Sequence, residues 1–315
     1  MVSVAQLVRA SVCEAEGRGF NSHRSPQIPQ SGPRKWRAPA RPGASPAGAF
    51  QAILRALLAQ IEANARGAAG KDPEFLHQLR VGLRRMRSSL QAFRPLLPAK
   101  ARKRLMRALR ELMPALGAAR DWDVFTAWLE SMAAAASLQA QARARRTAAR
   151  RRARRVLSSR AWRAFTEQAG AMQAAATSAS LGEFAATAIE RAHRKALKRA
   201  RGIDWRDASD RHAFRVRLKR LRYTCDFLAP SFAARPAAGY LESLKRLQDI
   251  LGELNDLRVG RALLSGMKGP ARAVNRSLAV REAALLRRLA PAWRALESRA
   301  PFWRPGGRRP RRAAT

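Results

Sequence analysis

The chain has 315 residues, 47% of them hydrophobic, which allows a sizeable core in one large or two small domains. It has no apolar run of about 18 residues and no secretory signal, so we expect no membrane span. Its two cysteines exclude a disulfide framework and fit a reducing cytoplasm. The formal net charge of +41, from 63 Lys and Arg against 22 Asp and Glu, favours a polyanionic partner such as nucleic acid, an acidic membrane face or polyphosphate.

The first 46 residues differ in composition from the rest. Pro, Gly and Ser crowd residues 25–46 without an apolar period, which is typical of disorder. The stretch VAQLVRASVCEAEGRGFNSHRSP resembles the peptide obtained when a tRNA gene is translated in a meaningless frame. We therefore expect 1–46 to be a disordered extension, or one that results from a start codon placed too far upstream, in which Cys13 and His23 have no role.

From about residue 47 to residue 300 the sequence predicts one helix after another, because Ala, Leu, Arg and Glu dominate and β-branched residues are scarce. Gly and Pro mark the breaks between them. The expected helices cover 47–66, 73–94, 99–116, 121–136, 138–157, 160–176, 182–201, 207–228, 237–253, 256–266 and 270–298. The segment 301–315 is expected to be a basic disordered tail.

The helical region contains an internal repeat. A shift of about 135 residues places 77–124 on 212–259 without a gap, and fourteen of the 48 aligned positions are identical. His77 then falls on His212, and each copy has a Leu-Gly pair, at Gly117 and at Gly252. Helical units of this length bury their apolar stripes as antiparallel bundles. We expect an all-α fold of two antiparallel four-helix bundles related by a pseudo-two-fold axis, with halves at about 47–178 and 179–300.

Helical spacing places a row of basic side chains beside the apolar face in each half. Neither row contains a carboxylate, and the two rows are His77, Arg80, Arg84 and Arg87, and His212, Arg215, Lys219 and Arg222. Arg85 and Arg220 fall one step round the helix, on the solvated side. Like charges three or four residues apart disfavour a helix by roughly 0.2–0.5 kcal/mol per pair. Two matched rows therefore indicate a ligand more than they indicate a coding bias towards arginine or a merely solvated face.

The rows favour a ligand that is recognised by its phosphates. Guanidinium groups bind phosphate oxygens bidentately, and a spacing of one helical turn, about 5.4 Å, can follow a chain of phosphates. Only 6% of the residues are aromatic and none lies in the rows, so stacking of bases is disfavoured. Each histidine either contacts phosphate or orients the start of its helix. A metal site would need both histidines together with carboxylates, and no HxxxH or HExxH spacing exists.

Asp121, Asp123 and Asp256 follow the two Leu-Gly pairs. Paired carboxylates suggest acid–base or metal chemistry, but we expect Asp121 and Asp256 to cap the next helix or to pair with a basic row. There is no nucleophile constellation and no Gly-rich phosphate loop, so we predict no catalytic residue, no metal and no cofactor. Lys245-Arg246 and the arginine run at 143–155 are further basic surfaces of lower specificity.

Four segments in this order, FLHQLRVGLRRMRSSLQAFRPLLP, LGAARDWDV, RHAFRVRLKRLRYTCDFL and LKRLQDILGELND, resemble the signature segments of the CHAD family, the conserved histidine α-helical domain. The resemblance covers roughly 47–300. It implies two pseudo-symmetric four-helix bundles and binding of inorganic polyphosphate through basic residues of the symmetric helices. Many relatives carry an N-terminal CYTH triphosphatase domain; this chain has no strand-rich region or acidic motif of that kind, and so resembles a stand-alone CHAD protein without enzymatic activity.

The resemblance assigns polyphosphate contact to basic residues of three segments, namely His77, Arg80, Arg84, Arg85, Arg87, His212, Arg215, Lys219, Arg220, Arg222 and Lys245. The expected function is noncatalytic binding of inorganic polyphosphate, in the cytoplasm and in association with polyphosphate granules, with nonspecific binding of nucleic acid as a side activity. One alternative is a nucleic-acid-binding basic helical protein, which the charge of +41 alone would support. Another is a metal-dependent phosphohydrolase, which would need a cluster of acidic ligands.

Overall fold

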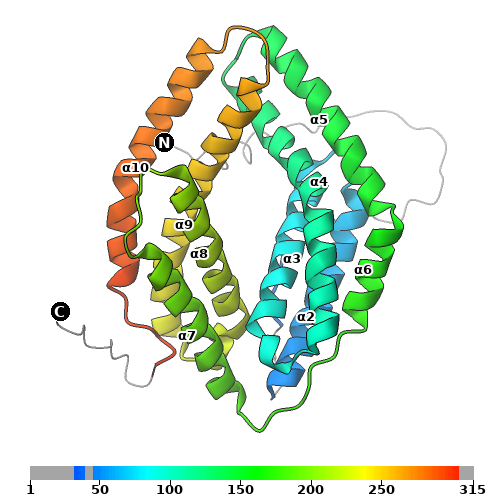
Figure 1. Cartoon of the computed structure of the whole chain (residues 1–315), viewed down its shortest axis with the longest axis vertical. Coiled ribbons are helices and arrows are strands. Elements are labelled where there is room, and N and C mark those ends of the chain that lie inside the picture. Colours follow the sequence, from blue (N-terminus) through cyan, green and yellow to red (C-terminus); the bar gives the residue numbers. More distant parts are fainter. Residues whose placement is uncertain (1–31, 40–44, 305–315) are drawn as a thin grey trace.

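The computed structural model describes residues 32–39 and 45–304. Within these residues the chain forms nine α-helices and two short 3-10 helices, and no residue lies in a strand, so the prediction of an all-α fold is confirmed. None of the helices in this part of the chain combines the length and the apolar character that a membrane span requires. The helices, labelled as in Figure 1, are α2 (Pro46–Gly67), α3 (Pro73–Ala92), α4 (Ala99–Ser131), α5 (Ala136–Leu157), α6 (Arg160–Gly170), α7 (Leu181–Ala200), α8 (Ala208–Leu228), α9 (Ala234–Ser265) and α10 (Arg272–Glu297).

The helices pack as two sets that follow each other along the chain and form the two arms of a diamond-shaped outline (Figure 1). In the first set α3 packs on α2 and α4, and α4 also packs on α5 and α6. In the second set α8 packs on α7 and α9, and α9 also packs on α10. The sets meet where α3 contacts α8 and where α4 contacts α9. The order of packing partners is thus the same in both sets, apart from the additional helix α6.

The helices that carry the two basic rows, α3 and α8, begin in the same way. Asp72 accepts a hydrogen bond from the backbone N–H of Glu74 at 2.8 Å, and Asp207 accepts one from the backbone N–H of Asp210 at 2.7 Å. The apolar side chains beside the two basic rows are buried, as the helical spacing predicts, and they are Leu76, Leu79, Leu83, Met86, Leu90, Phe214, Leu218, Leu221, Cys225 and Leu228. Full burial of such a side chain contributes about 1.5–3 kcal/mol, so these faces fix the orientation of α3 and α8.

The helices α4 and α9 are each continuous where the sequence predicted a break. Both Leu-Gly pairs lie inside a helix, since an internal glycine costs only about 1 kcal/mol relative to alanine. The prediction of separate helices at 99–116 and 121–136, and at 237–253 and 256–266, is therefore wrong. Consequently Asp121 and Asp256 do not cap a helix.

Short segments at both ends of the described region pack on the helices, which differs from the disorder predicted for them. In the segment 32–39, the backbone N–H of Arg34 donates to Oδ1 of buried Asn64 at 3.1 Å, and the ring of Trp36 lies 5.6 Å from that of Phe227. After α10, the indole N–H of Trp303 donates to Glu190 at 2.8 Å. The other predictions for the chain ends, including those on Cys13 and His23, concern residues 1–31, 40–44 and 305–315, which lie outside the described residues.

Two sets of polar contacts join the two arms, in addition to the packing of α3 on α8 and of α4 on α9. At the loop between α9 and α10, Gln141 of α5 donates to the carbonyl of Lys268 at 2.6 Å and accepts from its N–H at 3.1 Å, and Arg145 donates to the carbonyl of Gly266. We call this the loop clasp; it lies at one tip of the outline in Figure 1. Between α3 and α8, Arg85 donates to Asp226 at 3.0 Å, which we call the α3–α8 clasp.

Candidate anion-binding site

Basic side chains from both sets of helices come together where α3 and α8 meet. Arg80 and Arg84 project from α3, Arg120 from α4, and Arg215 and Lys219 from α8, and all five are half-buried. Desolvation lowers the pKa of Arg80, Arg215 and Lys219, and the charge of Arg84 lowers all three further. The two predicted rows therefore act on each other across the contact between the sets. We call these five residues the central cluster.

Burial makes the charged states of Arg80, Arg215 and Lys219 less favourable than they are in water. Desolvation, followed by the charge of Arg84, lowers the pKa of Arg80 to about 10. The pKa of Lys219 lies well below its usual value because the side chain is desolvated and because Arg215 and Arg84 repel its charge. Like charges that are close together and partly removed from water are stabilised when an anion neutralises them. The cluster is thus suited electrostatically to an anionic ligand.

Several N–H groups of the central cluster have no acceptor in the described part of the chain. The Nε atoms of Arg84 and Arg215, and both Nε and Nη1 of Arg80, are buried without a hydrogen-bond partner there. A buried donor without an acceptor costs about 1–3 kcal/mol, and more when it is charged. Phosphate oxygens are acceptors that match guanidinium geometry, so an oxyanion between α3 and α8 would satisfy these donors.

Carboxylates near the cluster offset only part of its charge. Asp121 lies 4.0 Å from Arg80, so of the two roles left open for Asp121 the structure shows the pairing with a basic row. Desolvation raises the pKa of Asp121, against the effect of Arg80. Asp256 is exposed, and its charge offsets part of the lowering that desolvation causes in the pKa of Arg215. Asp123 accepts a hydrogen bond from Arg150 of α5 at 2.7 Å and so anchors that helix. Among the described residues, no three His, Cys, Asp or Glu side chains gather in a way that would hold a metal ion.

Because Gly117 has no side chain, Arg80 can occupy the space beside it. A Cβ atom at position 117 would lie 2.9 Å from Arg80 Nη1, closer than the about 3.5–4.0 Å of ordinary van der Waals contact. The guanidinium therefore rests against the backbone of α4. At Gly252, the matching position in the second half, an added Cβ would meet no atom within 4 Å. The glycine of the first half is thus tied to the site, and the glycine of the second half is not.

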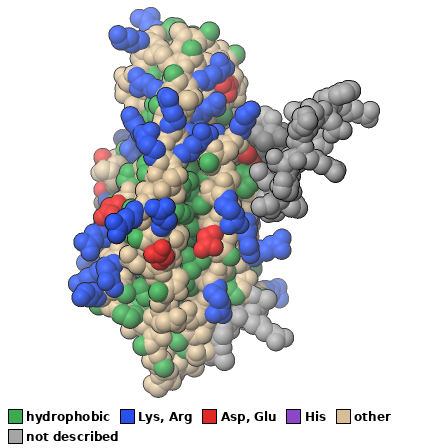
Figure 2. Space-filling view, turned by 90° about the vertical axis from the view of Figure 1, so that its right-hand side faces the viewer, with side chains coloured by type: hydrophobic (Ala, Val, Ile, Leu, Met, Phe, Trp, Pro, Cys, Tyr) green, Lys and Arg blue, Asp and Glu red, His purple; other side chains and the backbone are tan. Residues whose placement is uncertain are grey.

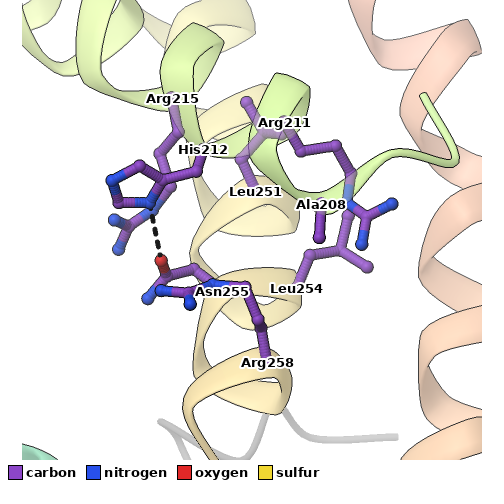
Figure 3. Close-up of a pocket in the computed structure, with 8 residues that line it drawn as sticks. All are labelled: Ala208, Arg211, His212, Arg215, Leu251, Leu254, Asn255 and Arg258. Atoms are coloured by element: carbon purple, nitrogen blue, oxygen red, sulfur yellow. Dashed lines mark hydrogen bonds between the residues drawn. The ribbon is translucent and has the colours of Figure 1, made fainter. Parts of the chain in front are cut away.

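The two histidines lie near the starts of α3 and α8, where His77 is half-buried and His212 is exposed. Nδ1 of His212 donates to Oδ1 of Asn255 on α9, at 3.2 Å (Figure 3). Because an amide oxygen can only accept, Nδ1 carries a proton. This contact holds the imidazole of His212 against α9.

Figure 3 shows a small cavity beside His212, lined by basic and polar side chains of α8 and α9 that include Arg211, Arg215, Asn255 and Arg258. Its volume of ≈ 10 Å³ is about that of one water-sized group. This cavity is therefore too small to enclose an oxyanion. A ligand that lies along the surface fits it better than one that must be enclosed.

Sequence reasoning missed three residues near this site: Arg120, Asn255 and Arg258. Arg120 and Asn255 each follow a Leu-Gly pair by three residues, which places them on the same helix face as that glycine. Had α4 and α9 been read as continuous, this spacing would have placed both residues on the face that meets the basic rows. Arg258 lies one turn after Asn255, and its charge lowers the pKa of Arg215.

Arg85 forms the α3–α8 clasp and is not on the solvated side, which corrects its predicted placement. Its guanidinium lies 5.2 Å from the ring centre of Trp36 and 5.3 Å from that of Tyr223, in addition to its ion pair with Asp226. Desolvation lowers the pKa of Arg85, and Asp226 raises it. Arg222, the last residue of the second row, donates to Gln248 at 3.2 Å. The contacts of Arg85 thus fix α3 against α8, and that of Arg222 joins α8 to α9.

The remaining predicted residues lie around the central cluster. Arg87 is exposed and Arg220 is half-buried. Desolvation, then Arg217 and Arg87, lower the pKa of Arg220, so Arg87 and Arg220 are close enough to act on each other. Lys245 is exposed on α9, and no hydrogen bond or ion pair among the described residues joins it to the cluster.

The sequence profile of the CHAD domain matches residues 52–265, which is more than half of the chain. The chain belongs to the CHAD family. The crystal structure of the CHAD domain from the plant Ricinus communis is similar, with a TM-score of 0.68 and 29% identity over 84% of this chain and 96% of that chain. PptA from Streptomyces chartreusis shares the fold, with a TM-score of 0.56 and 16% identity over 81% of this chain and 98% of that chain. A search of curated proteins found no match.

The family match confirms the resemblance read from the four sequence segments. The matched range of the CHAD domain runs from α2 to the end of α9 and includes every residue of the central cluster. The helix α10 lies beyond it and packs on α9.

Proposed function

We propose that this CHAD protein binds inorganic polyphosphate and does not catalyse a reaction. The observation that carries the proposal is the central cluster, where guanidinium groups from α3 and α8 are half-buried together and keep N–H groups without acceptors among the described residues. Polyphosphate binding through basic residues of these helices is also what membership of the family implies. A protein with this activity would associate with polyphosphate granules.

A chain of phosphates suits the central cluster better than a single anion. Arg80 and Arg84, like Arg215 and Lys219, are separated by about one helical turn, about 5.4 Å along the helix axis. Two such rows offer contacts along a length of chain, whereas one phosphate would reach only part of them. The rows themselves contain no aromatic residue, and Arg85 lies over the rings of Trp36 and Tyr223, so stacking of bases is disfavoured there.

We further infer that the two arms are antiparallel four-helix bundles related by a pseudo-two-fold axis, with an internal repeat offset of about 135 residues. The equal order of packing partners supports this reading, since α2 to α5 would correspond to α7 to α10. The helix α6 is then an addition to the first half. Under this symmetry the rows of α3 and α8 are equivalent and approach the axis from both sides.

The binding residues divide into three groups by position. Direct contact with phosphate is assigned to the central cluster, Arg80, Arg84, Arg120, Arg215 and Lys219. Arg85 positions α3 against α8, and Arg222 positions α8 against α9. Residues at the edge extend the positive surface along a longer chain, and these are His77, Arg87, His212, Arg220 and Lys245.

The test compares two double charge reversals in the full chain. Arg84→Glu with Lys219→Glu reverses one residue in each row. The control, Arg287→Glu with Arg288→Glu, makes the same change in total charge at two exposed arginines of α10. Binding of labelled long-chain polyphosphate is measured at near-physiological salt. Duplex DNA, single-stranded RNA and unlabelled polyphosphate serve as competitors at equal phosphate concentration.

The cluster variant should lose about 100-fold or more in affinity, because hydrogen bonds to charged groups contribute about 1.5–3 kcal/mol each. Its helix content, measured by circular dichroism, should not change. The control should lose less than about threefold, since distant surface charges are screened by salt. Unchanged affinity in the cluster variant would exclude the central cluster as the site, and equal losses in both variants would show that only net charge matters. Equal competition by DNA or RNA would identify a general polyanion binder.

A further inference from the structure

The helix α5 carries an arginine-rich outer surface that the central cluster does not use. Between Glu130 and Glu167 the sequence contains ten arginines and no Asp or Glu, and most of these arginines lie on α5. The residues of α5 that are buried form a narrow and mostly small stripe, Leu138, Ala142, Ala149 and Ala153. Most of the circumference of α5 is therefore left to solvent. Figure 2 looks onto this side of the molecule, where Lys and Arg side chains outnumber Asp and Glu.

Some arginines of α5 are held by the protein itself. Arg143 donates to Glu130 at 2.8 Å, Arg145 donates to the carbonyl of Gly266, and Arg150 donates to Asp123 at 2.7 Å. The side chains of another group are exposed and make no hydrogen bond or ion pair with any described residue. We call this group the outer arginines, and it consists of Arg151, Arg152, Arg154 and Arg155. These side chains are available to a partner.

Helical geometry spreads the outer arginines around the helix. At about 100° per residue, Arg151 projects from the crest opposite the buried stripe, and Arg154 and Arg155 project to either side of it. Arg152 lies further round the helix, on the side of Arg155. A helix with its side chains is about 10–12 Å across, close to the about 12 Å width of the major groove of B-form DNA. Cations on the crest and on both flanks thus fit a ligand that presents phosphates on two walls. A single polyphosphate chain would follow only one flank.

Other anionic partners fit this surface less well. A helix that lies in a membrane interface buries large apolar side chains in the lipid. On α5 the positions between the exposed arginines are Ala140, Ala144 and Thr147, and the large hydrophobic side chains that are exposed among the described residues, Val216 and Val280, lie on α8 and α10. Single-stranded nucleic acid requires aromatic rings for stacking, and α5 contains none.

We propose that the outer face of α5 binds double-stranded DNA through its phosphates, without reading the base sequence, at a site separate from the central cluster. The inference does not depend on the proposed polyphosphate function, because its residues lie on another helix and face outward. Basic side chains that neutralise phosphates release counterions, so the affinity of this face for DNA falls steeply with salt.

The test uses the full chain with Arg151→Glu, Arg154→Glu and Arg155→Glu. A matched control carries Arg276→Glu, Arg287→Glu and Arg288→Glu, which reverses the same number of exposed arginines on α10. Fluorescence anisotropy of a short labelled DNA duplex gives the affinity over a range of salt concentrations. Duplex RNA of the same length is tested beside it. Binding of labelled polyphosphate is measured in parallel, so that failure of this inference and failure of the proposed function are distinguished.

The α5 variant should lose about 30-fold or more in DNA affinity, and its salt slope should fall by about 0.9 for each phosphate that the variant no longer neutralises. Its polyphosphate affinity should change less than about threefold, and the α10 control should keep both affinities within that limit. Duplex RNA should bind more weakly than DNA, because its major groove is too deep and narrow for side chains. Intact DNA affinity in the α5 variant, an equal loss in the control, or tighter binding of RNA would overturn the proposal. So would loss of DNA binding in the Arg84→Glu, Lys219→Glu variant alone, which would place DNA at the central cluster.

Discussion

Replacement of Gly117 by alanine should weaken polyphosphate binding while it stabilises the fold. The new Cβ would lie 2.9 Å from Arg80 Nη1, so the guanidinium has to move by about 0.5–1 Å to reach ordinary contact distance. Because Arg80 is long and flexible, this movement costs little stability. Alanine is favoured over glycine inside a helix by about 0.8–1.0 kcal/mol. The free energy of unfolding should rise by up to that amount, which corresponds to an increase of about 2–4 °C in Tm.

The loss of affinity follows from the contact that Arg80 would make. A hydrogen bond to a charged group contributes about 1.5–3 kcal/mol, and a displacement of about 1 Å removes roughly half of it. The Kd for polyphosphate should therefore rise about three- to tenfold. Titration calorimetry gives the Kd and scanning calorimetry gives the Tm.

Gly252→Ala is the matched control for this prediction, because an added Cβ there would meet no atom within 4 Å. It should gain the same helix propensity and keep the affinity of the unchanged protein. If Gly117→Ala binds polyphosphate as tightly as the unchanged protein, the position of Arg80 against α4 does not matter for binding. If Gly252→Ala loses as much affinity as Gly117→Ala, the effect comes from helix rigidity and not from displacement of Arg80.

Two further predictions concern stability. Raising the pH from neutral towards about 10 should increase the free energy of unfolding of the protein without ligand. The pKa of Lys219 is lowered in the folded state, so the folded protein binds fewer protons than the unfolded chain, whose lysines titrate near pH 10.4. Urea denaturation measures this change, and the same pH dependence in a Lys219→Met variant would refute the assignment to Lys219. Trp303→Ala should lower the free energy of unfolding by about 3–5 kcal/mol, because Trp303 is 3% exposed and its ring packs on His193 and Tyr240. A loss below about 1 kcal/mol in urea denaturation would show that the segment after α10 is not part of the fold.

Periodicity was sufficient to predict which face of α3 and of α8 is buried, because the spacing of leucines in a helix depends only on local geometry. The same spacing placed Arg80, Arg84, Arg215 and Lys219 in rows that face each other in the structure. The continuity of α4 could not be predicted in the same way. Whether Gly117 ends a helix depends on what occupies the space beside it, and that space is filled by Arg80 from another helix.

Partners that lie far apart in the sequence account for the other differences. Arg85 appeared solvated because its own helix has no carboxylate within one turn of it, whereas its partner Asp226 comes from the other half of the chain. The segment that contains Trp36 has the composition of a disordered linker. Its contacts depend on Asn64 and Phe227, which no local pattern connects with it. Residues of the site that come from α4 and α9 were missed for the same reason.

The two clasps keep the rows of α3 and α8 close together although their like charges repel each other. A polyphosphate chain at the central cluster, as proposed, would offset this repulsion without having to bring the two helices together. The charge of +41 would attract such a chain over a long range, so the rate of association should fall as the salt concentration rises.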